Sequence, residues 1–246
     1  QNKIDLVTKE QALKNYNEIR NLLKGTFAEK APIIPVSAQQ DINLDKVFAF
    51  LAETPLPSRN PKEKPIFVIA RSFDINKPGT SPDKLHGTVL GGTLKQGCLK
   101  KGDLIEIKPG IPIKEANQVH YKTLRTKILG LFKGTYSVGE ITPGGSVSIE
   151  TELDMFVGKN DALSGNVLSL AQSLPDSVLS IKVKYNLFKE ILGAEQKTPV
   201  EPLKTNETLM LSVNTGVSVG LVKKITKDEV EFSLSLPIVP FKGDNV

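Results

Sequence analysis

The sequence predicts a multidomain protein in which a short α/β segment is followed by two all-β segments, each an antiparallel barrel. Residues 1–53 hold two helix-like stretches around a short apolar run. Residues 54–65 are rich in proline and charge and have no periodicity, as in a linker. From Ile66 onward the apolar residues recur with a period of two between turn-forming residues. We therefore expect domains at residues 1–60, 61–165 and 166–246.

The composition is that of an ordinary globular protein, with 39% hydrophobic and 24% charged residues in 246. The one cysteine, Cys98, excludes an internal disulfide, and no apolar run approaches the roughly 20 residues of a membrane helix. We therefore expect a cytoplasmic protein without a membrane partner. His86 and His120 are far apart and next to no cysteine, so we predict no metal site.

The charge favours lysine over arginine, since 28 of the 32 cationic residues are lysines and the net charge is +5. Lysine suits contact with phosphate, whereas reading of base edges favours the arginine fork. The balance permits an RNA or ribosome partner and gives no sign of DNA. A solvated lysine-rich surface is the simpler interpretation of the charge alone.

The first segment predicts two helices flanking a strand end. Thr8 and Gln11 have the spacing of a capping box, and a helical apolar face then continues until Gly25, which predicts a helix over residues 9–24. The apolar run at 32–36 suits the end of a buried strand. Asn43 is expected to cap a second helix that closes before Pro55. This order is the back half of an α/β unit.

The β-rich part predicts two groups of strands. The first covers residues 66–73, 88–94, 104–107 and 124–132, and the second covers 179–185, 208–213, 220–225 and 229–234. Residues 193–203 are predicted to form a surface loop. The glycine pairs 91–92 and 144–145 are interpreted as bulges or as places of close backbone approach, with bulges favoured. Because residues 243–246 form a turn signal, we expect the last barrel to be incomplete.

Asn2, Lys3, Ile4 and Asp5 form an N-K-x-D motif immediately before the first predicted helix. One aspartate carboxylate can accept hydrogen bonds from both guanine N1 and the 2-amino group, and adenine lacks that pair of donors. The Lys3 stem would cover the base, and Asn2 would tie the loop to its neighbours while reaching the opposite edge of the ring. The alternative for so short a motif is a plain polar loop.

A second element supports the guanine interpretation, because Ser37, Ala38 and Gln39 follow the apolar run at 33–36. There a backbone amide can donate to guanine O6. In GTPases the two motifs are separated by a helix and a strand, as they are in this sequence. We therefore predict a guanine-binding site made of Asn2, Lys3, Asp5, Ser37, Ala38 and Gln39.

The chain resembles the gamma subunit of eukaryotic and archaeal translation initiation factor two, a member of the translational GTPase superfamily. The resemblance covers nearly the whole chain and rests on these segments: QNKID at 1–5, GTFA at 25–28 followed by APIIPVSAQ, RSFDINKPG at 71–79, the glycines 91–92, KPGI at 108–111 and TPGG at 142–145. It implies the C-terminal part of a P-loop GTPase domain, followed by two β-barrels like those of elongation factor Tu.

The resemblance further implies an intact protein that binds GTP or GDP with Mg²⁺, hydrolyses GTP and delivers methionyl initiator tRNA to the small ribosomal subunit. Its partners would be the alpha and beta subunits of the same factor. The 246 residues hold no G-x-x-x-x-G-K-[ST] phosphate loop and no D-x-x-G segment, so we predict no catalytic residue here. We expect this fragment alone to hold no nucleotide. Two alternatives stay open: a β-barrel interaction module independent of nucleotide, and a related selenocysteine-specific elongation factor.

Overall fold

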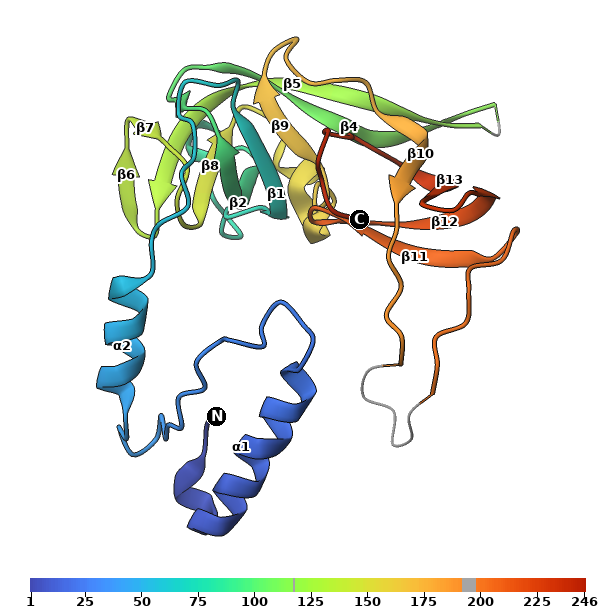
Figure 1. Cartoon of the computed structure of the whole chain (residues 1–246). Coiled ribbons are helices and arrows are strands. Elements are labelled where there is room, and N and C mark those ends of the chain that lie inside the picture. Colours follow the sequence, from blue (N-terminus) through green and yellow to red (C-terminus); the bar gives the residue numbers. More distant parts are fainter. Residues whose placement is uncertain (117, 192–197) are drawn as a thin grey trace. The chain divides into compact units, whose positions relative to one another are not determined.

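A computed structural model describes residues 1–116, 118–191 and 198–246, and positions 193–197 of the loop predicted at 193–203 lie outside these residues. The chain divides into two compact units, Gln1–Ser58 and Arg59–Val246, and Figure 1 shows their helices and strands. Within the described residues, no helix is long and apolar enough to cross a membrane.

The first unit contains a 3₁₀ helix η1 (Ile4–Leu6) and the helices α1 (Lys9–Leu23) and α2 (Leu44–Glu53). The capping box is confirmed, since the Gln11 amide donates to Thr8 Oγ1 and the Thr8 amide donates to Gln11 Oε1. Gly25 follows the helix with φ +73°, the left-handed conformation of a helix stop. The prediction of residues 9–24 was therefore right to within one residue.

The prediction that the Asn43 side chain caps the second helix is wrong. Asn43 stands at the N-cap position of α2, yet its side chain makes no capping hydrogen bond. The backbone of Asn43 is in the left-handed region (φ 58°). Its side-chain nitrogen Nδ2 instead donates to the carbonyl oxygen of Pro35 at 2.8 Å. Asn43 therefore fastens the loop before α2 to the end of the apolar segment.

The second unit begins with a closed antiparallel barrel. Its seven-stranded sheet has the order β4-β9-β1-β2-β8-β5-β6, and a further pairing of β4 with β5 closes the ring. The strands are β1 (Ile66–Phe73), β2 (Val89–Gln96), β4 (Leu104–Glu115), β5 (Gln118–Lys133), β6 (Tyr136–Val138), β8 (Val147–Thr151) and β9 (Val167–Leu170). A small sheet pairs β3 (Leu99–Lys100) with β7 (Glu140–Ile141), and the 3₁₀ helices η2 (Pro82–Lys84) and η3 (Met155–Asp161) complete the unit's first half.

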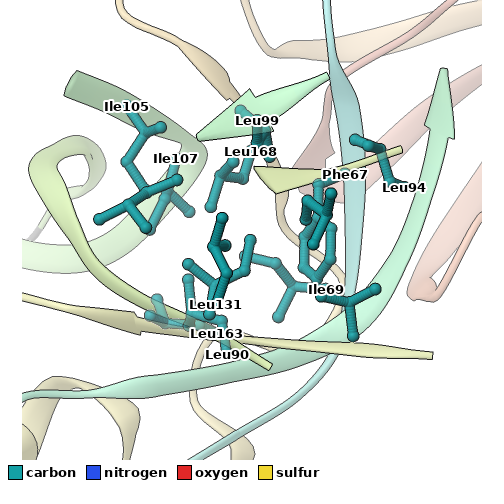
Figure 2. Close-up of a cluster of buried hydrophobic side chains, with 14 of the residues drawn as sticks. Phe67, Ile69, Leu90, Leu94, Leu99, Ile105, Ile107, Leu131, Leu163 and Leu168 are labelled. Carbon is teal, nitrogen blue, oxygen red and sulfur yellow. The ribbon is translucent and has the colours of Figure 1, made fainter. Parts of the chain in front are cut away.

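Closure of the barrel follows from alternation, because one face of each strand is apolar and packs inward. Phe67 and Ile69 of β1, Leu90 of β2 and Leu131 of β5 are fully buried in one core cluster. Figure 2 shows these side chains converging with Ile105, Ile107, Leu163 and Leu168. The barrel thus has its own core.

Three features of the barrel differ from the sequence predictions. Strand β9 lies between β4 and β1, so the barrel continues to Leu170 and a domain boundary at 165 cuts off a strand that it needs. Gly92 is a place of close approach, since a Cβ there would collide with the carbonyl oxygen of Val68. The bulge favoured for Gly144 and Gly145 is wrong, because both lie outside the strands in a turn with positive φ.

The second half of the unit is a four-stranded antiparallel sheet in the order β10-β13-β12-β11. Its strands are β10 (Val178–Lys184), β11 (Thr208–Val213), β12 (Gly216–Ile225) and β13 (Glu229–Ile238), which confirms all four predicted strands. Val222, Val230 and Phe232 lie in its core.

Residues between the barrel and this sheet are held by two side chains of β4. Buried Glu106 accepts hydrogen bonds from the amides of Ser173 and Leu174 at 2.8 and 2.7 Å. Lys108 donates to the carbonyl oxygens of Leu174 and Pro175 and pairs with Asp176 at 3.0 Å. Backbone amides and backbone carbonyl groups of this connection therefore both find hydrogen-bond partners on the one strand β4.

Candidate guanine-nucleotide site

The two predicted motif loops lie side by side in the first unit. The amide of Val36 donates to the carbonyl oxygen of Gln1 at 2.8 Å, and the amide of Ile4 donates to the carbonyl oxygen of Val36 at 3.3 Å. Val36, which precedes the second motif, thus shares backbone hydrogen bonds with the residue before the first motif and with Ile4 inside it, although residues 32–36 form no regular strand. This pairing brings together sequence segments separated by more than 30 residues.

Asn2 connects the two loops directly. Its Oδ1 accepts hydrogen bonds from the amide of Lys3 at 2.8 Å and from the amide of Ala38 at 3.2 Å. The side-chain nitrogen of Asn2, Nδ2, has no acceptor among the described residues, so it can donate to the edge of a guanine ring. Both roles predicted for Asn2 are therefore compatible with its position.

Lys3 and Asp5 present their side chains to solvent beside this link. Lys3 has φ 64° and ψ 34°, a left-handed conformation that is uncommon for a residue with a side chain. It precedes η1, whose first turn carries Asp5. Among the described residues the Asp5 carboxylate has no hydrogen bond or ion pair, so both of its oxygens can accept from a ligand.

The second loop is a tight turn built on Ser37. Ser37 is buried and exchanges backbone hydrogen bonds with Ile42 at 3.2 and 3.0 Å, and its hydroxyl accepts from the amide of Gln40 at 3.2 Å. The amides of Ser37 and Ala38 therefore already have protein acceptors. Ala38 and Gln39 are exposed at the turn, and Gln39 is the one of the three predicted residues whose amide has no acceptor within the described chain.

Two positioning residues were not predicted. The Gln1 side-chain amide donates to the carbonyl oxygen of Ala12 at 2.8 Å and to Asn15 Oδ1 at 2.9 Å, which anchors the first loop on α1. Asn43 anchors the second loop through Pro35. The sequence offers little signal for either, because their partners are a backbone carbonyl or a residue more than ten positions away.

The donors and acceptors around the two loops fit a guanine ring. An open carboxylate, an open side-chain amide and an open backbone amide match the donors and acceptors on the edges of that base. The described residues contain no group of three or more His, Cys, Asp or Glu side chains that could hold a metal ion. What these loops can do chemically is recognise a base.

The fold defines the class of protein. The chain superposes on a bacterial selenocysteine-specific elongation factor, EF-Sec, with a TM-score of 0.71 and 19% identity over 99% of this chain and 35% of that one. It also superposes on elongation factor SelB from Methanococcus maripaludis in complex with the GTP analogue GppNHp, with a TM-score of 0.71 and 18% identity over 99% of this chain and 52% of that one. The chain thus shares the fold of these two structures, and this fold fits β-barrels of the elongation-factor-Tu type.

The sequence comparisons show a likeness to one family. Residues 179–246 match the family model described as "Initiation factor eIF2 gamma, C terminal". The whole chain is 44% identical to translation initiation factor 2 subunit gamma from Pyrococcus horikoshii and from Pyrococcus abyssi, covering 100% of this chain and 60% of each relative. The chain is similar to the translation initiation factor 2 gamma family, in line with the resemblance seen in the sequence, and it spans 60% of the length of these relatives.

Proposed function

We propose that these residues are part of a GTP-binding subunit of a translation initiation factor that delivers methionyl initiator tRNA to the small ribosomal subunit. The observation that carries this proposal is the double hydrogen bond at Asn2 Oδ1, which joins the two loops that a guanine site requires. The identity of 44% over the whole chain favours an initiation factor over a selenocysteine-specific elongation factor, to which the likeness is 18–19%.

In the proposed site, Asp5 accepts hydrogen bonds from guanine N1 and the 2-amino group. The open amide of the Ser37–Gln39 turn donates to O6, and Asn2 reaches N7 with its amide nitrogen. The Lys3 stem lies over the ring. These residues select the base and do not touch the phosphates.

Hydrolysis of GTP is proposed for the full-length protein and not for any residue described here. Bound Mg²⁺ would neutralise charge on the β- and γ-phosphates when the nucleotide is present. No acidic cluster of the described residues is suited to hold it. The contribution of this chain is therefore discrimination of guanine from other bases.

The proposed partners are the alpha and beta subunits of the same factor, initiator tRNA and the small ribosomal subunit, in the cytoplasm. The likeness to these relatives supports this proposal, because they are named as one subunit of an initiation factor. The barrel with its own closed core supports a docking role that needs no nucleotide.

The test is binding of methionyl initiator tRNA by a full-length gamma subunit that carries these residues, with GTP, with GDP and without nucleotide. We expect tight binding with GTP and weaker binding in the other two states. Elongator methionyl tRNA serves as the control. Equal binding in all three states would contradict the proposal and favour a β-barrel interaction module that acts without nucleotide.

A further inference from the structure

The long hairpin formed by β4 and β5 carries an unusual share of the positive charge. Residues 111–127 contain Lys114, Lys122, Arg125 and Lys127 against one acid, Glu115, which is a net +3 where the whole chain has +5. Figure 1 shows this hairpin reaching beyond the other strands of its sheet. The charge therefore lies on an extended two-stranded ribbon.

The cations of this ribbon have no acidic partner. All four side chains are exposed, and none forms an ion pair with another described residue. Five cations elsewhere in the barrel do have one, in the pairs Arg71–Asp161, Lys95–Asp244, Lys100–Glu140, Lys108–Asp176 and Lys159–Asp74. The described cations of residues 111–127 are thus not compensated by ion pairs within the protein.

The register places most of these cations on one face. On β5, Leu124 and Ile128 point into the core, so Tyr121, Arg125 and Lys127 point outward. Lys114 is the cross-strand partner of Val119 and lies on that same outer face. Lys122, which pairs with Ile111, lies on the opposite face of the ribbon. From Val119 to Lys127 the row measures about 26 Å at the usual strand rise of about 3.3 Å per residue.

We propose that this ribbon is a docking surface for the phosphate backbone of double-stranded RNA. Three of the four cations are lysines, which suit point contact with phosphate and not bidentate reading of bases. The face offers one half-buried aromatic ring, Tyr121, and so lacks the series of stacking platforms that single-stranded nucleic acid requires. The choice of RNA over DNA rests on the proposed function; the surface itself needs neither the guanine site nor a nucleotide.

The experiment is a titration of a labelled RNA hairpin with the 246-residue chain, followed by fluorescence anisotropy at several salt concentrations. The variant K114Q/K122Q/K127Q removes three ribbon lysines. Arg125 is retained, because it lies opposite buried Glu106. The control K223Q/K224Q/K227Q removes three exposed lysines from the other sheet, so the two variants have the same net charge.

We expect the ribbon variant to lose affinity by about tenfold or more, and the slope of log K against log salt to fall in magnitude by about 2, because two of the three lysines lie on the docking face. The control should keep the parent's affinity within about twofold and keep its slope. Thermal unfolding of both variants should match that of the parent, which establishes that they are folded. GTP and tRNA delivery play no part in this measurement, so failure of the proposed function would not change its result.

Several outcomes would overturn the proposal. These are an unchanged slope for the ribbon variant, an equal loss for both variants, tighter binding of a single strand than of the duplex, and equal binding of a DNA duplex of the same sequence. If the chain bound an acidic protein through the three lysines and bound no RNA, the ribbon would be a protein-docking surface instead.

Discussion

Ala38 donates its backbone amide to Oδ1 of Asn2 at 3.2 Å, across 36 positions of sequence. The same oxygen accepts the amide of Lys3 at 2.8 Å. One side chain therefore fixes the distance between the loop that carries Asp5 and the loop that carries Ser37, Ala38 and Gln39.

Replacing Asn2 by alanine removes the acceptor for both amides. In a full-length gamma subunit carrying this segment, Asn2→Ala is expected to weaken GDP binding by about 1 to 3 kcal/mol, because the two loops lose their connection. Isothermal titration calorimetry gives the affinity directly. The control is Asn17→Ala on the exposed side of α1. Equal GDP affinity of parent and Asn2→Ala would show that the link does not order the site.

Changing Asp5 to asparagine replaces a double acceptor by a group that also donates. In the full-length protein, Asp5→Asn is expected to weaken GDP binding by about 2 to 5 kcal/mol, the usual cost of breaking a buried charged hydrogen bond. Xanthosine diphosphate should be accepted instead, since xanthine has an oxygen at position 2. Competition between the two nucleotides measures the switch, with Asp45→Asn as control. If the variant bound both nucleotides equally well, Asp5 would have no place in the site.

The 246 residues by themselves should not bind GTP measurably. Most of the binding energy of a triphosphate comes from backbone amides, a lysine and Mg²⁺ at a phosphate loop, and these residues contain no such motif. Calorimetry at millimolar nucleotide tests this. Saturable binding would mean that other residues of this chain hold the phosphates.

Residues 59–246 form a compact unit with its own core, so their fold should not depend on nucleotide. We expect this unit to capture the alpha subunit in a pull-down without GTP and to leave the beta subunit unbound. It keeps β9, which a fragment ending at residue 165 would lose. Capture of beta without alpha would contradict this expectation.

The ion pair between Arg71 and Asp161 joins β1 to η3 at 2.8 Å. The hydrogen bond from Arg71, followed by that from the Ser72 amide, holds the pKa of Asp161 below its ordinary value. A lowered folded-state pKa stabilises the fold at neutral pH, and this stabilisation is lost as the pH falls through that pKa. The free energy of unfolding of the parent should therefore exceed that of Asp161→Asn by a constant amount above about pH 5, and the gap should shrink below about pH 4. Thermal melts against pH measure it, with Asp83→Asn as control; a gap independent of pH would contradict the prediction.

Local patterns in the sequence were sufficient for much of the first unit. The capping box of Thr8 and Gln11 and the stop at Gly25 set the bounds of α1, because their hydrogen bonds and dihedral angles involve residues at most four positions apart. The same holds for β1 and β11, whose period-two alternation gave bounds identical to those observed. The N-K-x-D and Ser-Ala-Gln motifs likewise predicted candidate site residues without a structure.

Tertiary structure alone decided the partners of those residues. Nothing in the sequence around Asn43 shows that its side-chain nitrogen donates to Pro35 while its side-chain oxygen leaves α2 uncapped, since this choice depends on the left-handed backbone at that residue. Strand β9 has four residues, too few for a clear period, and its place between β4 and β1 is set by non-local pairing. The contact of Asn2 with Ala38 was likewise set by the parallel course of two distant segments, because a hydrogen bond between loops depends on where the chain returns and not on which residues stand beside it in sequence.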